Sequence, residues 1–146
     1  SRLIGVVTSE PYVTGQLLQI AKPLPGGPEA RYLLGVLNSA LLKWAFLMRY
    51  NRRDKTFPEI RIYELADLPI RPIDFDYPDD VAKHDRMVSL VDTMLELHKR
   101  LPDAKTAHDR ELIQRQIDAT ARQIDRLVYD LYGLTDEEIA IVEEAT

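Results

Sequence analysis

The feature that most constrains the fold is a regular spacing of apolar residues near the end of the chain. Steps of four, three, four, three and four residues separate Ile113, Ile117, Thr120, Ile124, Leu127 and Leu131. Because an α-helix has 3.6 residues per turn, this spacing places all six side chains on one helix face, in a heptad pattern. A helix of about 27 residues, at 1.5 Å per residue, would be ~40 Å long. That is a long rod for a chain of 146 residues.

A second long helix is expected immediately before this one. The same spacing recurs at Met87, Val91, Met94, His98 and Leu101, with an overlapping row at Leu90, Met94, Leu97 and Leu101. Pro102 and Asp103 then interrupt the pattern, and only a few residues separate the two segments. Because so short a connection forces neighbouring helices to run antiparallel, the sequence predicts a helical hairpin with a coiled-coil-like seam.

The residues after the seam predict a helix end and a new helix start. Gly133 suits the left-handed conformation that commonly ends a helix. Thr135 and Glu138 have the spacing of a capping box, in which each side chain bonds the backbone of the other residue. A short final helix is therefore expected, running through about Glu144.

The first half of the chain is expected to mix strands with one helix. Apolar and β-branched runs favour strands at residues 3–8 and 12–20, and residues 57–62 suit an edge strand because Pro58 cannot donate to a central ladder. Residues 29–50 are apolar on most faces and predict one buried helix, packed against a sheet. Two prolines in residues 68–73 favour an extended segment there.

These patterns together predict an α+β protein with two parts. Residues 1–76 would form a small β-containing lobe with one buried helix, and residues 77–146 the long antiparallel helical hairpin and a short C-terminal helix. The boundary is the acidic, turn-rich segment Asp74–Asp80, whose carboxylates suit the start of the following helix. Because the chain opens on a hydrophobic run without an initiator methionine, we expect it to be a fragment of a longer protein.

Charge is divided unequally along the chain. Residues 1–62 contain nine Lys or Arg and four Asp or Glu, a net charge of +5, whereas residues 63–146 contain ten and twenty, a net charge of −10. The two halves should therefore face different partners. The chain has no cysteine, which excludes disulfides and thiol chemistry and fits a cytoplasmic protein. No apolar stretch reaches the ~20 residues of a membrane span, so no membrane partner is expected.

Catalytic motifs are absent from the sequence. It contains no glycine-rich nucleotide-binding motif, and its three histidines lack metal-ligand spacing, so we expect no metal site. His98 is expected to be a half-buried helix residue. Pro78-Asp79 followed by Asp103-Ala104-Lys105 formally resembles a nuclease motif, but these residues would lie at opposite ends of a helix, ~30 Å apart. We therefore predict no catalytic residue in this chain.

A basic cluster is the strongest candidate for a binding site. Four cations lie within residues 49–55, at the end of the predicted buried helix, beside a tyrosine and an asparagine. Phosphates bind Lys and Arg, adenine is read by Asn or Gln, and guanine by Arg, so the cluster suits DNA. It also suits a solvated helix end, which the helix dipole makes favourable for cations. The candidate DNA-binding residues are Lys43, Arg49, Tyr50, Asn51, Arg52, Arg53, Lys55 and Arg61, with Arg71 as a further neighbour.

Three segments resemble a known family. Leu33-Leu34-Gly35-Val36-Leu37-Asn38-Ser39, Phe57-Pro58-Glu59-Ile60-Arg61 and Leu65-Ala66-Asp67-Leu68-Pro69-Ile70 look like the target-recognition domains of restriction–modification enzymes. The segment from Ile124 to Thr135 is similar to the end of the TaqI-like C-terminal specificity domain. This domain follows the methyltransferase core in type II and type IIG enzymes that modify adenine, and is akin to type I specificity subunits. The resemblance runs from about Leu33 to Val142.

The resemblance implies a division of labour in a larger enzyme. The first part would read double-stranded DNA, and the hairpin would set its distance from the methyltransferase core of the same parent chain. Catalysis would lie in that core, which would bind S-adenosylmethionine and methylate a flipped adenine; this fragment would bind no cofactor. In a second hypothesis the heptad seam pairs with a partner subunit, and the fragment assembles restriction–modification subunits without touching DNA. Homo-oligomerisation through the hairpin and a fused nuclease are left open.

Overall fold

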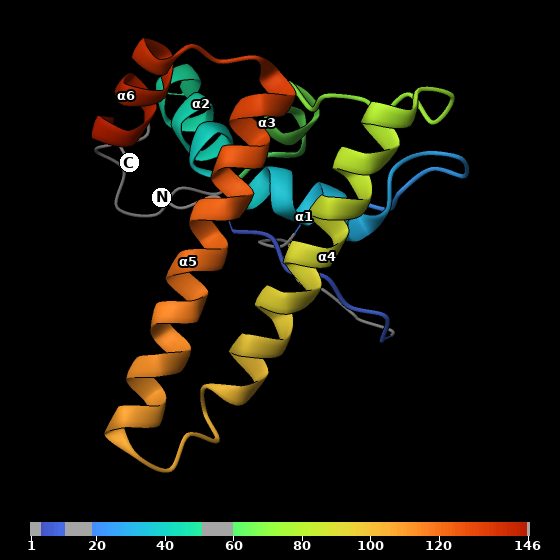
Figure 1. Cartoon of the computed structure of the whole chain (residues 1–146). Coiled ribbons are helices and arrows are strands. Elements are labelled where there is room, and N and C mark those ends of the chain that lie inside the picture. Colours follow the sequence, from blue (N-terminus) through green and yellow to red (C-terminus); the bar gives the residue numbers. More distant parts are fainter. Residues whose placement is uncertain (1–3, 11–18, 51–59, 146) are drawn as a thin grey trace.

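The computed structural model describes residues 4–10, 19–50 and 60–145, and its regular elements are all helices. Figure 1 shows a long hairpin whose open end holds the shorter helices. The helices, in chain order, are α1 (Ala30–Asn38), α2 (Ala40–Tyr50), α3 (Ile62–Ala66), α4 (Pro78–Arg100), α5 (Ala107–Tyr132) and α6 (Asp136–Ala145). The predicted α+β class is wrong, because the described residues contain no strand.

The strand predictions fail because the extended segments find no strand partner among the described residues. Residues 4–8 form no regular element. Gly5 instead bonds the Asn38 side chain, donating its N–H to Oδ1 at 2.8 Å and accepting from Nδ2 at 3.0 Å. Ile62 begins α3 rather than ending an edge strand. The predictions at residues 12–18 and 57–59 lie outside the described residues, whereas the expected non-helical segment at residues 68–73 is confirmed.

The single helix predicted over residues 29–50 is two helices, α1 and α2, with a break at Ser39. Ser39 has extended backbone, with φ −65° and ψ 158°. Its buried hydroxyl donates to the Val36 carbonyl at 2.7 Å and accepts from the Leu42 N–H at 3.3 Å. Asp125 on α5 accepts from the Ala40 N–H at 2.8 Å and so caps α2. Serine and aspartate side chains thus replace the helical backbone bonds at the break.

The predicted antiparallel hairpin is confirmed, because α4 and α5 lie side by side along the rod (Figure 1). The six residues of the heptad row are all buried. Near the turn, Ile113 and Ile117 pack against Leu97 in a small cluster. Gly133 ends α5 with φ 65°, and Thr135 and Glu138 exchange the two capping bonds that begin α6. The signals for helix ends in the sequence were therefore correct.

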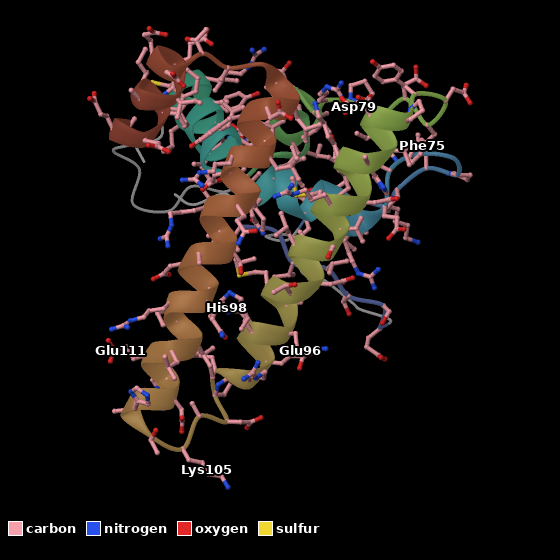
Figure 2. The ribbon with its side chains drawn as sticks, in the orientation of Figure 1. Phe75, Asp79, Glu96, His98, Lys105 and Glu111 are labelled. Atoms are coloured by element: carbon pink, nitrogen blue, oxygen red, sulfur yellow. The ribbon has the colours of Figure 1, made fainter. Side chains whose placement is uncertain are left out.

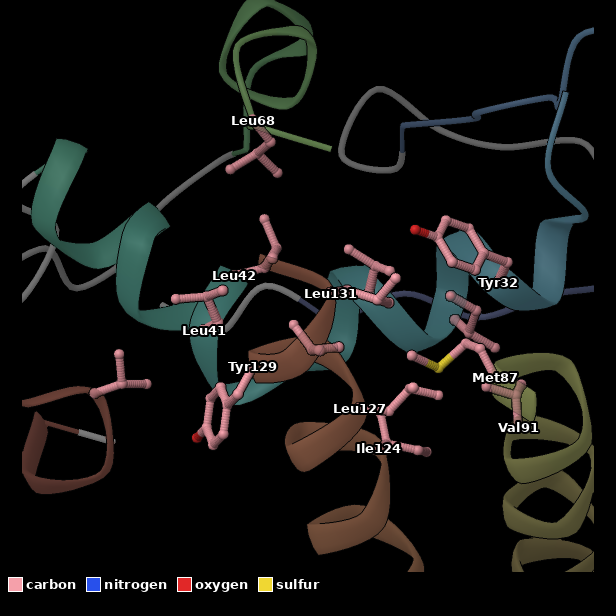
Figure 3. Packing of buried hydrophobic residues seen from close by; sticks show 14 of the residues in the cluster. Tyr32, Leu41, Leu42, Leu68, Met87, Val91, Ile124, Leu127, Tyr129 and Leu131 are labelled. Carbon is pink, nitrogen blue, oxygen red and sulfur yellow. The ribbon is translucent and has the colours of Figure 1, made fainter. Parts of the chain in front are cut away.

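At the open end of the hairpin, α1 packs against both long helices, most extensively against α4. Gly35 permits this approach, because a Cβ atom added there would lie 2.4 Å from Met87 Sδ and 3.0 Å from Val91 Cγ2. Figure 3 shows Met87 and Val91 beside α1. His98, further along α4, is exposed rather than half-buried as predicted. The neighbouring Leu97 is the residue buried against Ile113 and Ile117 of α5, so His98 lies off the contact face.

One main hydrophobic core contains residues from both predicted parts of the chain. It includes Tyr32 and Phe46 from the first part and Met87, Leu127 and Val142 from the second. Figure 3 shows side chains from these helices interleaved in that core. The division at residue 76 stays a prediction. Both parts contribute side chains to the same core. None of the described helices is long and apolar enough to cross a membrane.

Candidate nucleic-acid interface

The structure describes half of the eight predicted DNA-binding residues. Lys43, Arg49 and Tyr50 lie on α2, and Arg61 directly precedes α3. The other four, Asn51, Arg52, Arg53 and Lys55, lie outside the described residues. The DNA contacts predicted for those four residues therefore stay a prediction, and the described geometry concerns the other four.

Arg49 and Tyr50 converge on one carboxylate that the sequence analysis did not select. The Arg49 Nε–H donates to Asp67 Oδ2 at 2.6 Å, and Nη2 contacts the same oxygen. The Tyr50 hydroxyl also donates to Asp67 Oδ2, at 2.9 Å. These bonds hold the pKa of Asp67 below its ordinary value and raise the pKa of Arg49. At neutral pH the cluster therefore contains a charged pair and a neutral phenol.

Tyr50 is fixed by its ring as well as by its hydroxyl. The ring lies 5.3 Å from that of Phe46, at an interplanar angle of 54°. Phe46 is fully buried in the core, whereas Tyr50 is half-buried. This arrangement anchors the Tyr50 hydroxyl beside Asp67.

Lys43 does not lie with Arg49. They are six positions apart on α2, which places them ~120° apart around the helix axis. Lys43 is near the half-buried Asp125 of α5. Burial raises the pKa of Asp125, whereas the charge of Lys43 lowers it. The structure therefore separates Lys43 from the Arg49–Tyr50 pair.

Arg61 has an exposed side chain at the start of α3. Its backbone N–H donates to the buried Glu64 carboxylate at 2.8 Å, a bond that begins the helix. The main chain at Arg61 is thereby fixed while its guanidinium stays accessible.

Arg71 does not join the basic cluster, because its side chain and backbone bind residues of α4 and α5. Its guanidinium binds Asp80, at the start of α4, through bonds of 3.0 and 2.8 Å. Its N–H donates to the Tyr132 hydroxyl at 3.0 Å, and its carbonyl accepts from the Tyr32 hydroxyl at 3.0 Å. Tyr132 in turn donates to the Pro69 carbonyl at 2.6 Å. The segment between α3 and α4 is thereby clamped to α1, α4 and α5.

Sequence reasoning missed Asp67, Asp80 and Tyr132. Asp67 stands in the Leu65–Ile70 segment that carried part of the family resemblance, but nothing in the spacing pairs it with Arg49. Tyr132 and Arg71 are 61 residues apart, so only the antiparallel course of α4 and α5 brings them together. Asp80 looked like one of several carboxylates that suit a helix N-terminus.

Candidate metal ligands are scattered among the described residues. No group of three or more potential metal-ligating side chains comes together among them. Asp79 and Lys105, from the two halves of the formal nuclease pattern, lie at opposite ends of the hairpin rod (Figure 2). What remains in the described part is a set of accessible cations at the ends of α2 and α3, suited to binding an anion.

Comparison with known proteins finds a family similar to the first half of the chain. The family model of the TaqI-like C-terminal specificity domain matches residues 2–70. The match includes the three segments between Leu33 and Ile70 that resembled target-recognition domains, and it ends before the tail, whose resemblance stays a prediction. No curated protein and no solved structure matches the chain significantly. Residues 2–70 of this chain therefore resemble the TaqI-like C-terminal specificity domain, a resemblance that suggests DNA target recognition in a methyltransferase.

Proposed function

We propose that the chain supplies DNA sequence recognition and a helical scaffold at the C-terminus of a site-specific DNA adenine methyltransferase of a restriction–modification system. The observation that carries the proposal is the specificity-domain match over residues 2–70. The net positive charge of residues 1–62 supports it, because binding to phosphates is driven by Lys and Arg. Accessible Arg49 and Arg61 at the ends of α2 and α3 support the same role.

The scaffold part of the proposal is supported by the junction between the specificity domain and the hairpin. Tyr132, Asp80 and Tyr32 bind the segment Pro69–Arg71 from α5, α4 and α1. Asp80 and Tyr132 belong to the hairpin and Tyr32 to the matched residues, so bonds from both parts hold this segment. The hairpin would thereby set the distance between the DNA-reading residues and the methyltransferase core of the parent chain.

Methyl transfer itself is assigned to the parent enzyme. The sequence contains neither an Asn/Asp-Pro-Pro-Tyr/Phe motif nor a glycine-rich cofactor loop. S-adenosylmethionine would supply the methyl group in the core, and this chain would hold the DNA so that one adenine can be flipped into that core. No residue of this chain takes part in a chemical step in the proposal.

The alternative function, assembly of subunits through the heptad seam, has less support. Ile117 and Ile124 are 7% and 8% exposed because other helices of the same chain cover them. A partner helix would have to displace those contacts. Sedimentation of the chain alone tests this alternative: a stable dimer that is lost on changing Ile117 and Ile124 to polar residues, without loss of helix content, would support it.

Fluorescence anisotropy with labelled duplexes containing the parent enzyme's target tests DNA recognition. Binding should weaken steeply with salt, by a slope of about 0.9 per phosphate contact in a plot of log K against log salt. A variant with Arg49, Arg52, Arg53 and Lys55 changed to Ala should lose most of the affinity. The matched control changes the four arginines of α5, at positions 110, 115, 122 and 126, and should bind like the parent chain. Equal loss in both variants would contradict the site.

A further inference from the structure

The guanidinium of Arg49 is held along one edge and open at the other. Its Nε and Nη2 atoms face Asp67 Oδ2. The N–H groups of Nη1 and the outer N–H of Nη2 therefore point away from this carboxylate. Tyr50, whose hydroxyl donates to the same Asp67 oxygen, is also a hydrogen-bond neighbour of Arg49. The Arg49 side chain is 57% exposed, so the open edge is accessible to a ligand.

The carboxylate that holds Arg49 is itself fixed. The backbone N–H of Asp67 donates to the Tyr63 carbonyl at 3.1 Å, so the end of α3 positions it. The Tyr50 hydroxyl donates to the same carboxylate oxygen, and the Tyr50 ring packs on buried Phe46. Arg49 is thus oriented by a group that is tied both to α3 and to the core.

A fixed arginine suits contact with a base. Phosphate contacts position a protein on DNA but carry no sequence information, whereas reading a base requires donor groups in fixed positions. The open edge of a guanidinium presents two parallel N–H donors. Guanine presents two acceptors, O6 and N7, at a matching separation in the major groove, and arginine bound to them is the commonest specific contact.

We propose that Asp67 orients Arg49 so that the open edge of its guanidinium reads O6 and N7 of a guanine in duplex DNA. This inference rests on the proposed function and deepens it, because it names one base and the residue that reads it. Arg49 is the base-reading residue. Asp67 is a positioning residue, and Tyr50 supports Asp67 instead of stacking on a base.

The test begins with a selection of duplexes that carry a randomised core, using the full chain. Each guanine common to the selected duplexes is then replaced singly by 7-deazaguanine, which removes only the N7 acceptor. The parent chain should lose about tenfold in affinity at one such position. Arg49→Lys, which keeps the charge but loses the planar fork, should be insensitive to 7-deazaguanine at that position.

Asp67→Ala separates positioning from charge. It should also lose the sensitivity to 7-deazaguanine, while its binding to unrelated duplexes stays equal or becomes tighter because a carboxylate is gone. Asp67→Asn, which keeps one acceptor for Nε, should retain part of the sensitivity. Asp118→Ala is the matched control, because it removes an exposed carboxylate on α5. It should keep the full tenfold effect, and melting curves should show that all variants fold.

Three results would overturn the inference, and they differ in what else they affect. If Asp67→Ala tightens all duplexes equally and keeps the 7-deazaguanine effect, Asp67 is only a competing counter-ion. If the parent chain selects a sequence but no guanine N7 matters, Arg49 does not read guanine, although DNA recognition stands. If the chain binds no duplex in a salt-dependent manner, the proposed function fails together with the inference.

Discussion

Arg71 and Asp80 form a two-bond ion pair that joins the segment after α3 to the first turn of α4. The bonds are 3.0 and 2.8 Å long, and Asp80 also accepts from the Asp74 N–H at 3.0 Å. The Asp80 side chain is 8% exposed, whereas Asp79 beside it is 61% exposed. Of two adjacent acidic residues, one therefore organises the junction and the other faces solvent.

The first prediction concerns acid stability at this pair. Hydrogen bonds from Arg71 and Asp74 hold the pKa of Asp80 below its ordinary value. Asp80 therefore contributes stability above the pKa of an unfolded aspartate, about 4, and this contribution is lost as the pH falls through the lower, folded-state pKa. Asp80→Asn should melt at a lower temperature than the parent chain at pH 7, and the difference should shrink in strong acid. Asp79→Asn should change the melting temperature less at pH 7; an equal change would contradict the assignment.

The second prediction concerns the Tyr132 hydroxyl. Tyr132→Phe removes one bond with the Arg71 N–H and one with the Pro69 carbonyl while keeping the ring. At about 0.5–1.5 kcal/mol for each bond, the free energy of unfolding should fall by about 1–3 kcal/mol. Urea denaturation followed by circular dichroism measures it. Tyr63→Phe, at a residue that is 56% exposed, is the control and should be close to neutral.

The third prediction concerns the close approach of α1 and α4. Gly35→Ala would place a Cβ atom 2.4 Å from Met87 Sδ and 3.0 Å from Val91 Cγ2, so the helices or side chains must shift. We expect a loss of about 1–3 kcal/mol in the free energy of unfolding, although alanine favours helix more than glycine does. Met87→Ala in the same chain should relieve the contact. The double variant should therefore lose less than the sum of the two single variants, and a strictly additive result would contradict a steric conflict between the added Cβ atom and Met87.

The fourth prediction concerns Asp125, which caps α2 from α5. Burial raises its pKa, so its charged form is disfavoured in the folded chain even though it accepts from the Ala40 N–H. The stability linked to this group is present below the unfolded pKa of about 4 and is lost as the pH rises through the higher, folded-state pKa. Asp125→Asn keeps an acceptor but cannot ionise. Its melting temperature relative to the parent chain should therefore be higher at pH 7 than at pH 4, and the opposite trend would contradict a raised pKa.

The helical half could be predicted because its signals are local. The repeat from Ile113 to Leu131, the glycine after it and the Thr135–Glu138 pair each depend on residues within a few turns. The strand predictions lacked such support, because a strand is stable only when another strand pairs with it. Residues 4–8 have the composition of a strand, but Asn38 satisfies the backbone of Gly5 from the end of α1.

The candidate site could likewise be predicted only where its signals are local in the sequence. Sequence alone identified the basic segment and the family resemblance, since both are contained in short stretches of residues. It could not show that Asp67 binds Arg49 and Tyr50, or that Arg71 is engaged by Asp80 and Tyr132. The sequence analysis therefore placed Arg71, whose bonds are structural, beside the predicted DNA-binding cluster.

By itself, the sequence determined that the second half is an antiparallel helical hairpin and that positive charge is concentrated in the first half. Periodicity and composition are sufficient for both, because a helix is stabilised along its own length and charge is a property of the residues present. Only the tertiary structure decided that a helix breaks at Ser39, that α1 packs against the hairpin in a shared core, and which cations stay accessible. Those outcomes depend on partners 18 to 85 residues away, at Asp67 for Arg49 and at Asp125 for Ala40, and the fold alone brings them within bonding distance.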